Sequence, residues 1–202
     1  MKYTRELIED KFQRERLKFI FFWGHGKTGS ADGSVTKSCL SQWWDCKFTV
    51  DGVEYHTAEQ YMMAQKAVLF GDEKIRVEIM AAKHPKQYKA LGQKVSGFVQ
   101  KVWDENCRDI VIKGNIGKFS QNGDLKTFLL NTKERVLVEA SPYDKIWGIG
   151  MSEDDPKCEN PTLWNGTNFL GFCLMEVRDI LREKENDKDR RRQKIRLGQD
   201  IG

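Results

Sequence analysis

The sequence predicts an α+β domain that is mostly helical and carries a small β-sheet or hairpins. Two patterns support this fold class. Apolar residues recur at intervals of three and four positions through several segments between residues 57 and 184, as they do in amphipathic helices. Strand-like runs are short and few, and they lie at residues 19–24, 47–56 and 134–141. A chain of 202 residues is long enough to bury one hydrophobic core.

The domain organisation follows from where these patterns begin and end. We expect one domain at residues 19–182, preceded by an N-terminal helical extension at 1–18 and followed by a basic flexible tail at 183–202. From residue 182 onward the chain carries eight Lys or Arg against five Asp or Glu. A solvated helical extension or a disordered tail is the plain interpretation, and an accessory, transient contact with nucleic acid phosphates is the alternative.

The N-terminal elements are short. Residues 4–17 place apolar side chains such as Leu7 and Ile8 among charged ones, which indicates an amphipathic helix. The apolar run at 19–24 indicates a strand. Further on, two short strand-like runs flank Asp51-Gly52, a pair typical of a tight hairpin turn. We therefore expect a strand, a polar stretch and a hairpin.

The helix at residues 57–70 has clear start and stop signals. Thr57 precedes the helical pattern and Gln60 stands three positions later, so the two side chains can satisfy free N–H groups in a capping box. Gly71 follows the last apolar residue, as expected of a helix end.

More helices and one buried strand account for the remaining pattern. Breaks at His84-Pro85 and near Ser96-Gly97 separate three helical segments. The elements expected after residue 71 are helices at 72–83, 85–95, 98–119 and 124–132, a strand at 134–141, a long loop at 150–167 and a last helix at 168–184.

Composition and hydropathy exclude several classes of protein. Eleven Phe, six Trp and 39% hydrophobic residues are too many for a disordered polymer, although 32% of the chain is charged. No apolar run approaches the roughly 20 residues of a membrane span. The first residues also lack the apolar stretch of a secretory signal. We therefore expect no membrane partner and an intracellular location, cytoplasmic or nuclear.

The cysteines and histidines do not suggest a disulfide framework or a metal centre. The five cysteines are odd in number and widely spaced, so we interpret them as reduced thiols. No two of them have C-x-x-C spacing and the three histidines stand alone, which leaves a zinc site with few ligands. The chain also lacks a glycine-rich loop of the P-loop or dinucleotide type. We expect no metal and no cofactor.

Two charged residues stand out within the helix at 57–70. Glu59 and Lys66 are seven positions apart, so they lie within about 20° of one another around the axis and about 10 Å apart along it. Apolar residues occupy much of the same helix, and a buried charge is costly unless something pairs with it. A pair of solvated, unrelated side chains is the alternative interpretation.

A second group of chemical residues follows the strand at 134–141. Glu139, Asp144 and Trp147 lie beside the permissive backbone of Gly148, which suits a ligand-binding turn. The alternative interpretation is a turn with a solvated Asp and a Trp buried in the core. Trp103 could equally be a core side chain.

Taken together, these segments resemble the NADAR, or YbiA-like, family over roughly residues 19–182. The resemblance lies in several separated pieces, at residues 51–72, 102–122, 137–150 and 166–181, so no single short motif carries it. FFWGH at 21–25 and LSQWW at 40–44 look like the family's N-terminal ligand-facing stretches. The matching positions are Glu59, Lys66, Trp103, Lys118, Phe119, Asp144, Trp147, Gly148, Asn168, Leu170, Gly171, Met175 and Arg178.

The resemblance implies an N-glycosidase, an enzyme that hydrolyses the bond between a ribose and a nitrogen base. It implies catalytic roles for Lys66, Glu59 and Asp144. The residues that it places on the substrate are Phe22, Trp23, Gly24, His25, Ser41, Gln42, Trp103, Trp147, Gly148, Asn168 and Gly171.

The chemistry of N-glycoside cleavage fits these residue types. Positive charge develops at the ribose C1 and negative charge on the departing base, so the site needs a carboxylate near the sugar and a proton source near the base. Glu59 and Asp144 suit these tasks in either order. Lys66 suits attack on C1 to form a Schiff base, with phosphate binding as the alternative role.

The family implies two substrate classes. One is ADP-ribosylated guanine, and the other is the ribosylamino-pyrimidine phosphates of the riboflavin pathway. Members that resemble the riboflavin branch carry several arginines before the helix tryptophan, where this chain has Gln93, Lys94 and Lys101. Gln42 also replaces the asparagine of many members. We therefore favour ADP-ribosyl-guanine, with release of ADP-ribose. A non-catalytic module that binds ADP-ribose or other NAD metabolites is the alternative of another class.

Overall fold

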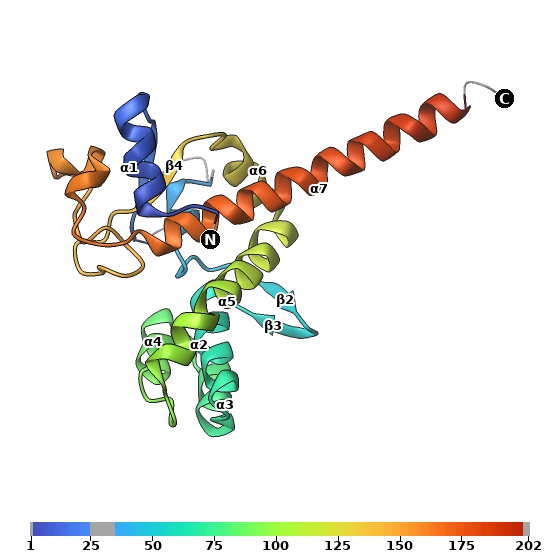
Figure 1. Ribbon diagram of the computed structural model, residues 1–202. Coiled ribbons are helices and arrows are strands. Elements are labelled where there is room, and N and C mark those ends of the chain that lie inside the picture. Colours follow the sequence, from blue (N-terminus) through green and yellow to red (C-terminus); the bar gives the residue numbers. More distant parts are fainter. Residues whose placement is uncertain (1, 25–34, 200–202) are drawn as a thin grey trace.

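The computed structural model describes residues 2–24 and 35–199. Within these residues seven α-helices and two small sheets form one YbiA-like domain, which confirms the predicted mostly helical α+β class (Figure 1).

Four helices build one half of the domain. They are α2 (Ala58–Leu69), α3 (Glu73–Ala81), α4 (Pro85–Gly92) and α5 (Gln100–Gln121), and α2 packs against the other three (Figure 1). The predicted cap of α2 is present, since the Thr57 side chain accepts a hydrogen bond from the Gln60 N–H at 3.0 Å. The chain leaves this helix at Gly71, whose φ of 70° favours glycine.

The main sheet joins the beginning and the later part of the chain. Strand β1 (Phe19–Phe22) pairs in parallel with β4 (Val136–Glu139), in a register that places Phe22 opposite Glu139. Parallel neighbours need a crossover connection, and helices α2 to α6 lie within it. The two strands therefore end at the same edge of the sheet.

The predicted hairpin is present as β2 (Phe48–Val50) and β3 (Val53–Tyr55). Asp51 and Gly52 have φ angles of 50° and 79°, which is the backbone of a two-residue hairpin turn. The Tyr55 ring lies edge-on to Tyr61 of α2, with 5.0 Å between centroids. The hairpin is thereby tied to α2.

The other expected elements are also present. Helix α1 (Arg5–Arg14) begins at Thr4, whose hydroxyl accepts a hydrogen bond from the Leu7 N–H, and α6 (Gly123–Asn131) precedes β4. The long loop at 150–167 contains two 3-10 helices, η2 (Pro156–Glu159) and η3 (Pro161–Leu163).

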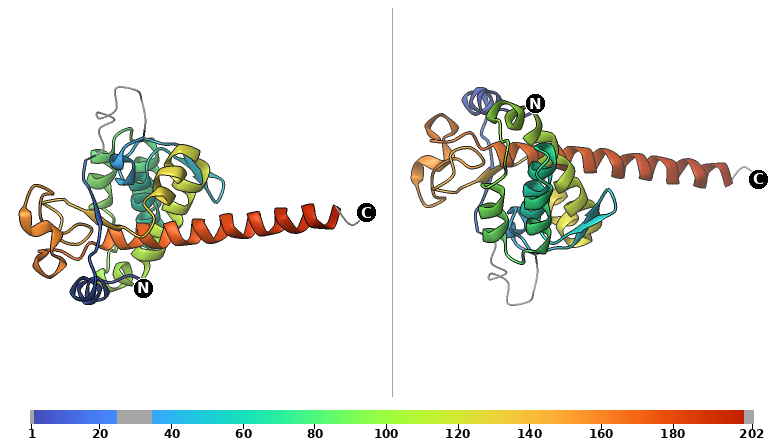
Figure 2. Two further views of the ribbon diagram at one scale, coloured as in Figure 1. Left: turned by 90° about the horizontal axis from the view of Figure 1, so that it is seen from above. Right: turned by 90° about the horizontal axis from the view of Figure 1, so that it is seen from below.

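The last helix, α7 (Phe169–Gln199), is longer than predicted. The apolar pattern predicts an end near residue 184, but the helix continues through residues 183–199, which corrects the expected flexible tail there and agrees with the interpretation as a solvated helical extension. No proline and no glycine interrupts residues 172–197, and ion pairs three positions apart support the exposed part. These pairs join Lys188 to Glu185, Arg190 to Asp187 and Arg192 to Asp189. The end of α7 projects away from the domain (Figure 2). No helix in the described part of the chain is long and apolar enough to span a membrane.

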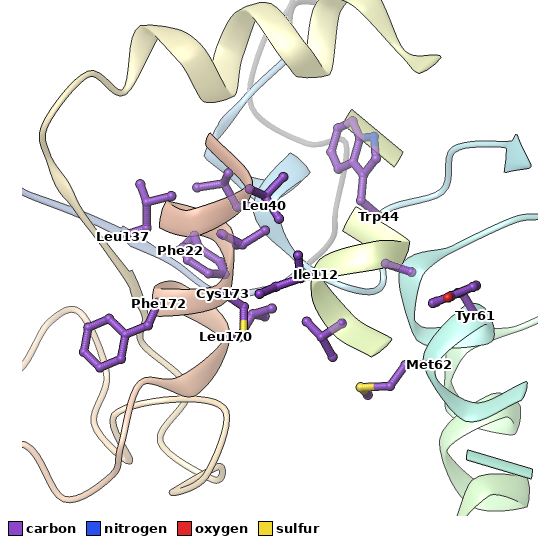
Figure 3. Close-up of a cluster of buried hydrophobic side chains, with 14 of the residues drawn as sticks. Phe22, Leu40, Trp44, Tyr61, Met62, Ile112, Leu137, Leu170, Phe172 and Cys173 are labelled. Atoms are coloured by element: carbon purple, nitrogen blue, oxygen red, sulfur yellow. The ribbon is translucent and has the colours of Figure 1, made fainter. Parts of the chain in front are cut away.

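One hydrophobic core connects the sheet with the helical half. Side chains from β1, β4, α7, α5 and α2 meet in a single cluster (Figure 3). Its labelled members include Phe22, Leu137, Phe172, Ile112 and Met62. Strand β4 packs against both β1 and α7, so the end of β4 lies against the core.

Candidate active site

A cavity of about 450 Å³ opens beside α2, α4 and the turn that follows β4. This volume lies within the range of small-molecule sites, roughly 300–1,000 Å³. Glu59, Lys66 and Asp144, the three residues predicted to be catalytic, all line it.

The cavity brings together six of the residues predicted to bind substrate and leaves out four. Those that line it are Trp23, Gly24, Ser41, Gln42, Trp103 and Trp147. Those that do not are Phe22, Gly148, Asn168 and Gly171. His25 lies outside the described residues. Trp103 and Trp147 thus contribute ring surface to the cavity, whereas Phe22 is fully buried in the core.

Asn168 positions the end of β4 and does not face the cavity. Its side chain is fully buried, accepts a hydrogen bond from the Glu139 N–H at 3.0 Å and donates one to the Leu137 carbonyl at 2.9 Å. Asn168 has a positive φ of 55°, a backbone conformation that Asn tolerates better than most residues. Its amide therefore fixes the backbone that carries Glu139.

Gly171 also has a packing role in the structure. A Cβ atom at this position would lie 2.1 Å from the Leu137 carbonyl oxygen and 2.6 Å from both Asn168 amide atoms. Only a residue without a side chain lets α7 approach β4 this closely.

We predict that Gly171→Ala destabilises the protein by about 3 kcal/mol, because backbone rather than a flexible side chain blocks the added methyl group. Urea unfolding monitored by circular dichroism measures this loss. Gly123→Ala is the matched control, since nothing lies within 4 Å of the Cβ it adds. A Gly171→Ala protein as stable as the wild type would contradict the packing role.

Glu59 lies in the first turn of α2, where its N–H donates to the Gln42 carbonyl at 2.9 Å. Its side chain is 5% exposed. Burial raises the pKa of Glu59 to about 7, although the Lys89 charge and a hydrogen bond with the Trp43 side chain oppose the shift. Glu59 is therefore able to carry a proton near neutral pH.

Glu139 is a cavity residue that sequence reasoning did not place among the catalytic groups. It is the last residue of β4 and lines the cavity. Its Oε2 is buried without a hydrogen-bond partner in the described part of the chain. Burial raises its pKa to about 8, and the charges of Asp144 and Glu59 add to the effect. The sequence feature that could have identified Glu139 as a site residue is its position directly after the apolar run Val136–Val138.

Asp144 is held in the turn after β4. Its Oδ1 accepts hydrogen bonds from the N–H groups of Ile146 at 2.9 Å and Trp147 at 2.8 Å. The same turn brings the Trp147 ring against Phe169, with 5.1 Å between centroids. The carboxylate and the indole therefore reach the cavity from one fixed backbone segment.

Lys66 lines the cavity and lies against two aromatic rings, of which Trp103 also lines the cavity. Its Nζ lies 4.2 Å from the centroid of the Phe98 ring and 5.5 Å from that of Trp103. Burial lowers the pKa of Lys66, which increases the share of the neutral amine. A neutral amine is a nucleophile, whereas an ammonium is not.

A comparison with known protein families identifies the family of this chain. The model of the NADAR domain matches residues 21–182. This chain belongs to the NADAR family. Its relatives include N-glycosidase R617 of Acanthamoeba polyphaga mimivirus, 41% identical over 82% of this chain and 97% of that protein. Protein irg-1 of Caenorhabditis elegans is 39% identical over 70% of this chain and 68% of that protein.

Bacterial members of the family agree in sequence and in fold. N-glycosidase YbiA of Escherichia coli is 34% identical over 68% of this chain and 76% of that protein. The NMR structure of E. coli YbiA superposes with a TM-score of 0.65 and 28% identity, and it covers 85% of this chain and 89% of YbiA. The enzyme class of this NADAR chain is accordingly that of a hydrolase, an N-glycosidase.

The NADAR domain also buries a lysine that supports the backbone of Ser41, a cavity residue. The Lys118 side chain is fully buried, and its Nζ donates to the Ser41 carbonyl at 2.7 Å. Asn115 donates to Gln42 Oε1 at 3.3 Å, while Gln42 Nε2 is buried without a partner among the described residues. Gln42, which lines the cavity, therefore carries a buried donor whose hydrogen bond is not satisfied among the described residues.

No group of three His, Cys, Asp or Glu residues suited to a metal ion occurs in residues 2–24 and 35–199. The expected absence of a metal and of a cofactor stays a prediction.

The two raised carboxyl pKa values predict how stability depends on pH. The folded protein keeps protons on Glu59 up to about pH 7 and on Glu139 up to about pH 8, whereas an unfolded chain releases them near 4.5. Above pH 4.5 the folded state therefore binds more protons, and stability falls as pH rises to about 8.

We expect Glu139→Gln to exceed the wild type in stability by on the order of 2 kcal/mol at pH 9, with the difference disappearing near pH 4. Urea unfolding across this pH range measures the effect. Glu78→Gln, on the exposed side of α3, is the control. A gain for Glu139→Gln that is equal at every pH would contradict the burial of an ionisable carboxyl.

Proposed function

We propose that this NADAR N-glycosidase cleaves the bond between guanine and the ribose of an ADP-ribose group, releasing ADP-ribose. The observation that carries the proposal is the grouping of Lys66 with Glu59 and Glu139 in one cavity. Burial lowers the pKa of the amine and raises the pKa of both carboxyls, so it shifts all three groups towards their neutral forms. This set provides a nucleophile and proton donors for one glycosidic bond.

The first step is attack by the amine. The neutral Nζ of Lys66 bonds to the ribose C1 while the bond from C1 to the base nitrogen breaks and leaves its electron pair on the base. Glu59 or Glu139 gives a proton to the departing base, and the charged nitrogen at C1 passes a proton to a carboxylate. Asp144 contributes negative charge as C1 becomes positive.

The second step frees the sugar. The C1–O4 bond breaks, O4 takes up a proton, and the nitrogen lone pair forms the C1=N bond of a Schiff base. Water then adds to C1 and the C1–N bond breaks. This returns the Lys66 amine and releases the sugar as its aldehyde.

Features of the cavity wall support the choice of substrate. Gln93 lines the cavity, and it belongs to the segment before the helix tryptophan in which members that resemble the riboflavin branch carry several arginines. A compact ribose phosphate would therefore meet less positive charge from this segment. Trp23, Trp103 and Trp147 supply ring surface for heteroaromatic groups. We place the reaction inside the cell, in the cytoplasm or nucleus, where ADP-ribosylated nucleic acid and nucleotides occur.

The decisive experiment is mass spectrometry of the products formed by the full chain and by its Lys66→Ala variant. One substrate is an oligonucleotide with ADP-ribosyl-guanine, and the other is a ribosylamino-pyrimidine phosphate. Release of ADP-ribose by the wild type alone is the expected result. Release of ribose 5-phosphate instead would transfer the enzyme to the riboflavin branch, and binding without release would favour the ADP-ribose-binding module.

A further inference from the structure

Two exposed aromatic side chains stand together at the mouth of the cavity. Trp23 is 52% exposed and Tyr143 is 86% exposed, and both line the cavity. Their ring centroids lie 5.9 Å apart with a tilt of 55° between the planes. An exposed pair of large rings at the edge of a binding cavity is a surface of the kind that ligands cover.

The sheet, rather than the hydrophobic core, places these rings side by side. Trp23 directly follows β1 and Tyr143 lies in the turn after β4, and the two strands are parallel neighbours that end at the same edge. The backbone of the turn is anchored, because the Tyr143 N–H donates to Ser141 Oγ at 3.4 Å. The anchored backbone thus carries a ring that contributes little to the core.

The ring geometry specifies how a ligand is held. A flat group between two parallel rings needs about 7 Å, twice the usual carbon–carbon contact of about 3.5 Å. The spacing of 5.9 Å is shorter and the two planes are tilted by 55°, so no ligand ring fits between Trp23 and Tyr143. A ligand ring stacks on the exposed face of one ring and meets the other at its edge, and we call this tilted pair the platform.

The position of the platform indicates which part of a substrate it meets. The buried carboxyls Glu59 and Glu139 mark the inner end of the cavity, where the glycosidic bond is cleaved. A cavity of about 450 Å³ holds one ligand of moderate size. A second ring system linked to the ribose–base unit therefore extends to the mouth.

We propose that Trp23 and Tyr143 form a stacking subsite for a second heteroaromatic ring of the substrate, beyond the ribose–base unit. The inference rests on the proposed function. The ring comes from one of two sources, the adenine of the ADP-ribose group or the base of the neighbouring nucleotide in a strand.

The test compares Trp23→Ala, Tyr143→Ala and Tyr143→Phe with the wild type by isothermal titration calorimetry. The first two ligands are ADP-ribose and ribose 5-phosphate. The other two are short oligonucleotides with one ADP-ribosyl-guanine, flanked either by normal bases or by abasic sites, and Lys66→Ala is added to every protein to prevent turnover. Leu163→Ala is the control, because it removes an exposed apolar side chain that does not line the cavity.

Each alanine variant is expected to lose about tenfold in affinity for ligands that carry the second ring, while Tyr143→Phe keeps it. A loss for ADP-ribose but not for ribose 5-phosphate identifies adenine. A loss only with the normally flanked oligonucleotide identifies the neighbouring base. Equal affinities of wild type and variants for all four ligands, or an equal loss for all four, would overturn the subsite.

Failure of the subsite and failure of the proposed function give different results. The titrations measure binding without turnover, so they report on the rings even if the wild type releases no ADP-ribose from guanine. Release of ADP-ribose with no affinity difference between wild type and variants would uphold the function and refute the subsite.

Discussion

Replacement of Lys66 by alanine is expected to lower kcat by on the order of 10⁴-fold, because the substitution removes the nucleophile of the proposed covalent mechanism. The Lys66 Nζ lies against the Phe98 and Trp103 rings, and burial lowers its pKa. Reduction with borohydride during turnover should link the sugar to the wild-type protein through Lys66 and leave Lys66→Ala unmodified. Intact-protein mass spectrometry and peptide mapping measure both results.

Two other variants distinguish a nucleophilic role of the Lys66 amine from a role of its positive charge alone. Lys66→Arg keeps a positive charge but no neutral amine, because the guanidinium pKa is above about 12, so it should be as inactive as Lys66→Ala. Lys89→Ala removes a different cation from the same cavity and should still be trapped by borohydride. Turnover by Lys66→Arg at more than a tenth of the wild-type rate would refute the Schiff-base mechanism and support a phosphate-binding role for Lys66.

Glu59→Gln is expected to lower kcat by about 10²- to 10⁴-fold, the usual range for loss of a general acid or base. Burial raises the pKa of this carboxyl to about 7, so the wild type holds the proton below that pH and loses it above. Wild-type kcat/KM should therefore fall as pH rises through about 7 to 8, where Glu139 also titrates. Steady-state rates from pH 5 to pH 9 measure the profile.

The pH profile distinguishes proton transfer from structural damage. The residual kcat/KM of Glu59→Gln should no longer fall as pH rises through about 7, since the amide does not titrate in this range. Glu59→Asp keeps a titratable group on a shorter side chain and should recover part of the rate. Loss of activity in Glu59→Gln with an unchanged pH profile would assign the titrating group to another residue.

Several local features were predictable from neighbouring residues alone. The start of α2 depends on Thr57 and Gln60, which are three positions apart, and the hairpin depends on Asp51-Gly52. Capping and turn formation use hydrogen bonds and backbone angles within a few residues, so the sequence pattern reports them directly. The length of α7 was underestimated, because an exposed helix supported by ion pairs lacks the apolar period used to find helices.

The candidate site also combines features that the sequence predicts with features that only the structure shows. Glu59, Lys66 and Asp144 were predicted to be catalytic from a family pattern, and all three line one cavity. The pattern did not separate side chains that face a ligand from those that shape the backbone. Asn168 and Gly171 belong to the second kind, because they allow α7 to lie against β4.

By itself, the sequence determined the helices, the hairpin, the α+β class and the family. Only the tertiary structure decided that Glu139 stands beside Glu59 and that Tyr143 stands beside Trp23. The second juxtaposition depends on β1 pairing in parallel with β4, across more than a hundred residues. Such pairing is stabilised by burying two apolar strands in one core, and many apolar runs satisfy that requirement equally. Local patterns therefore identify the strands, and packing of the whole chain selects their partners.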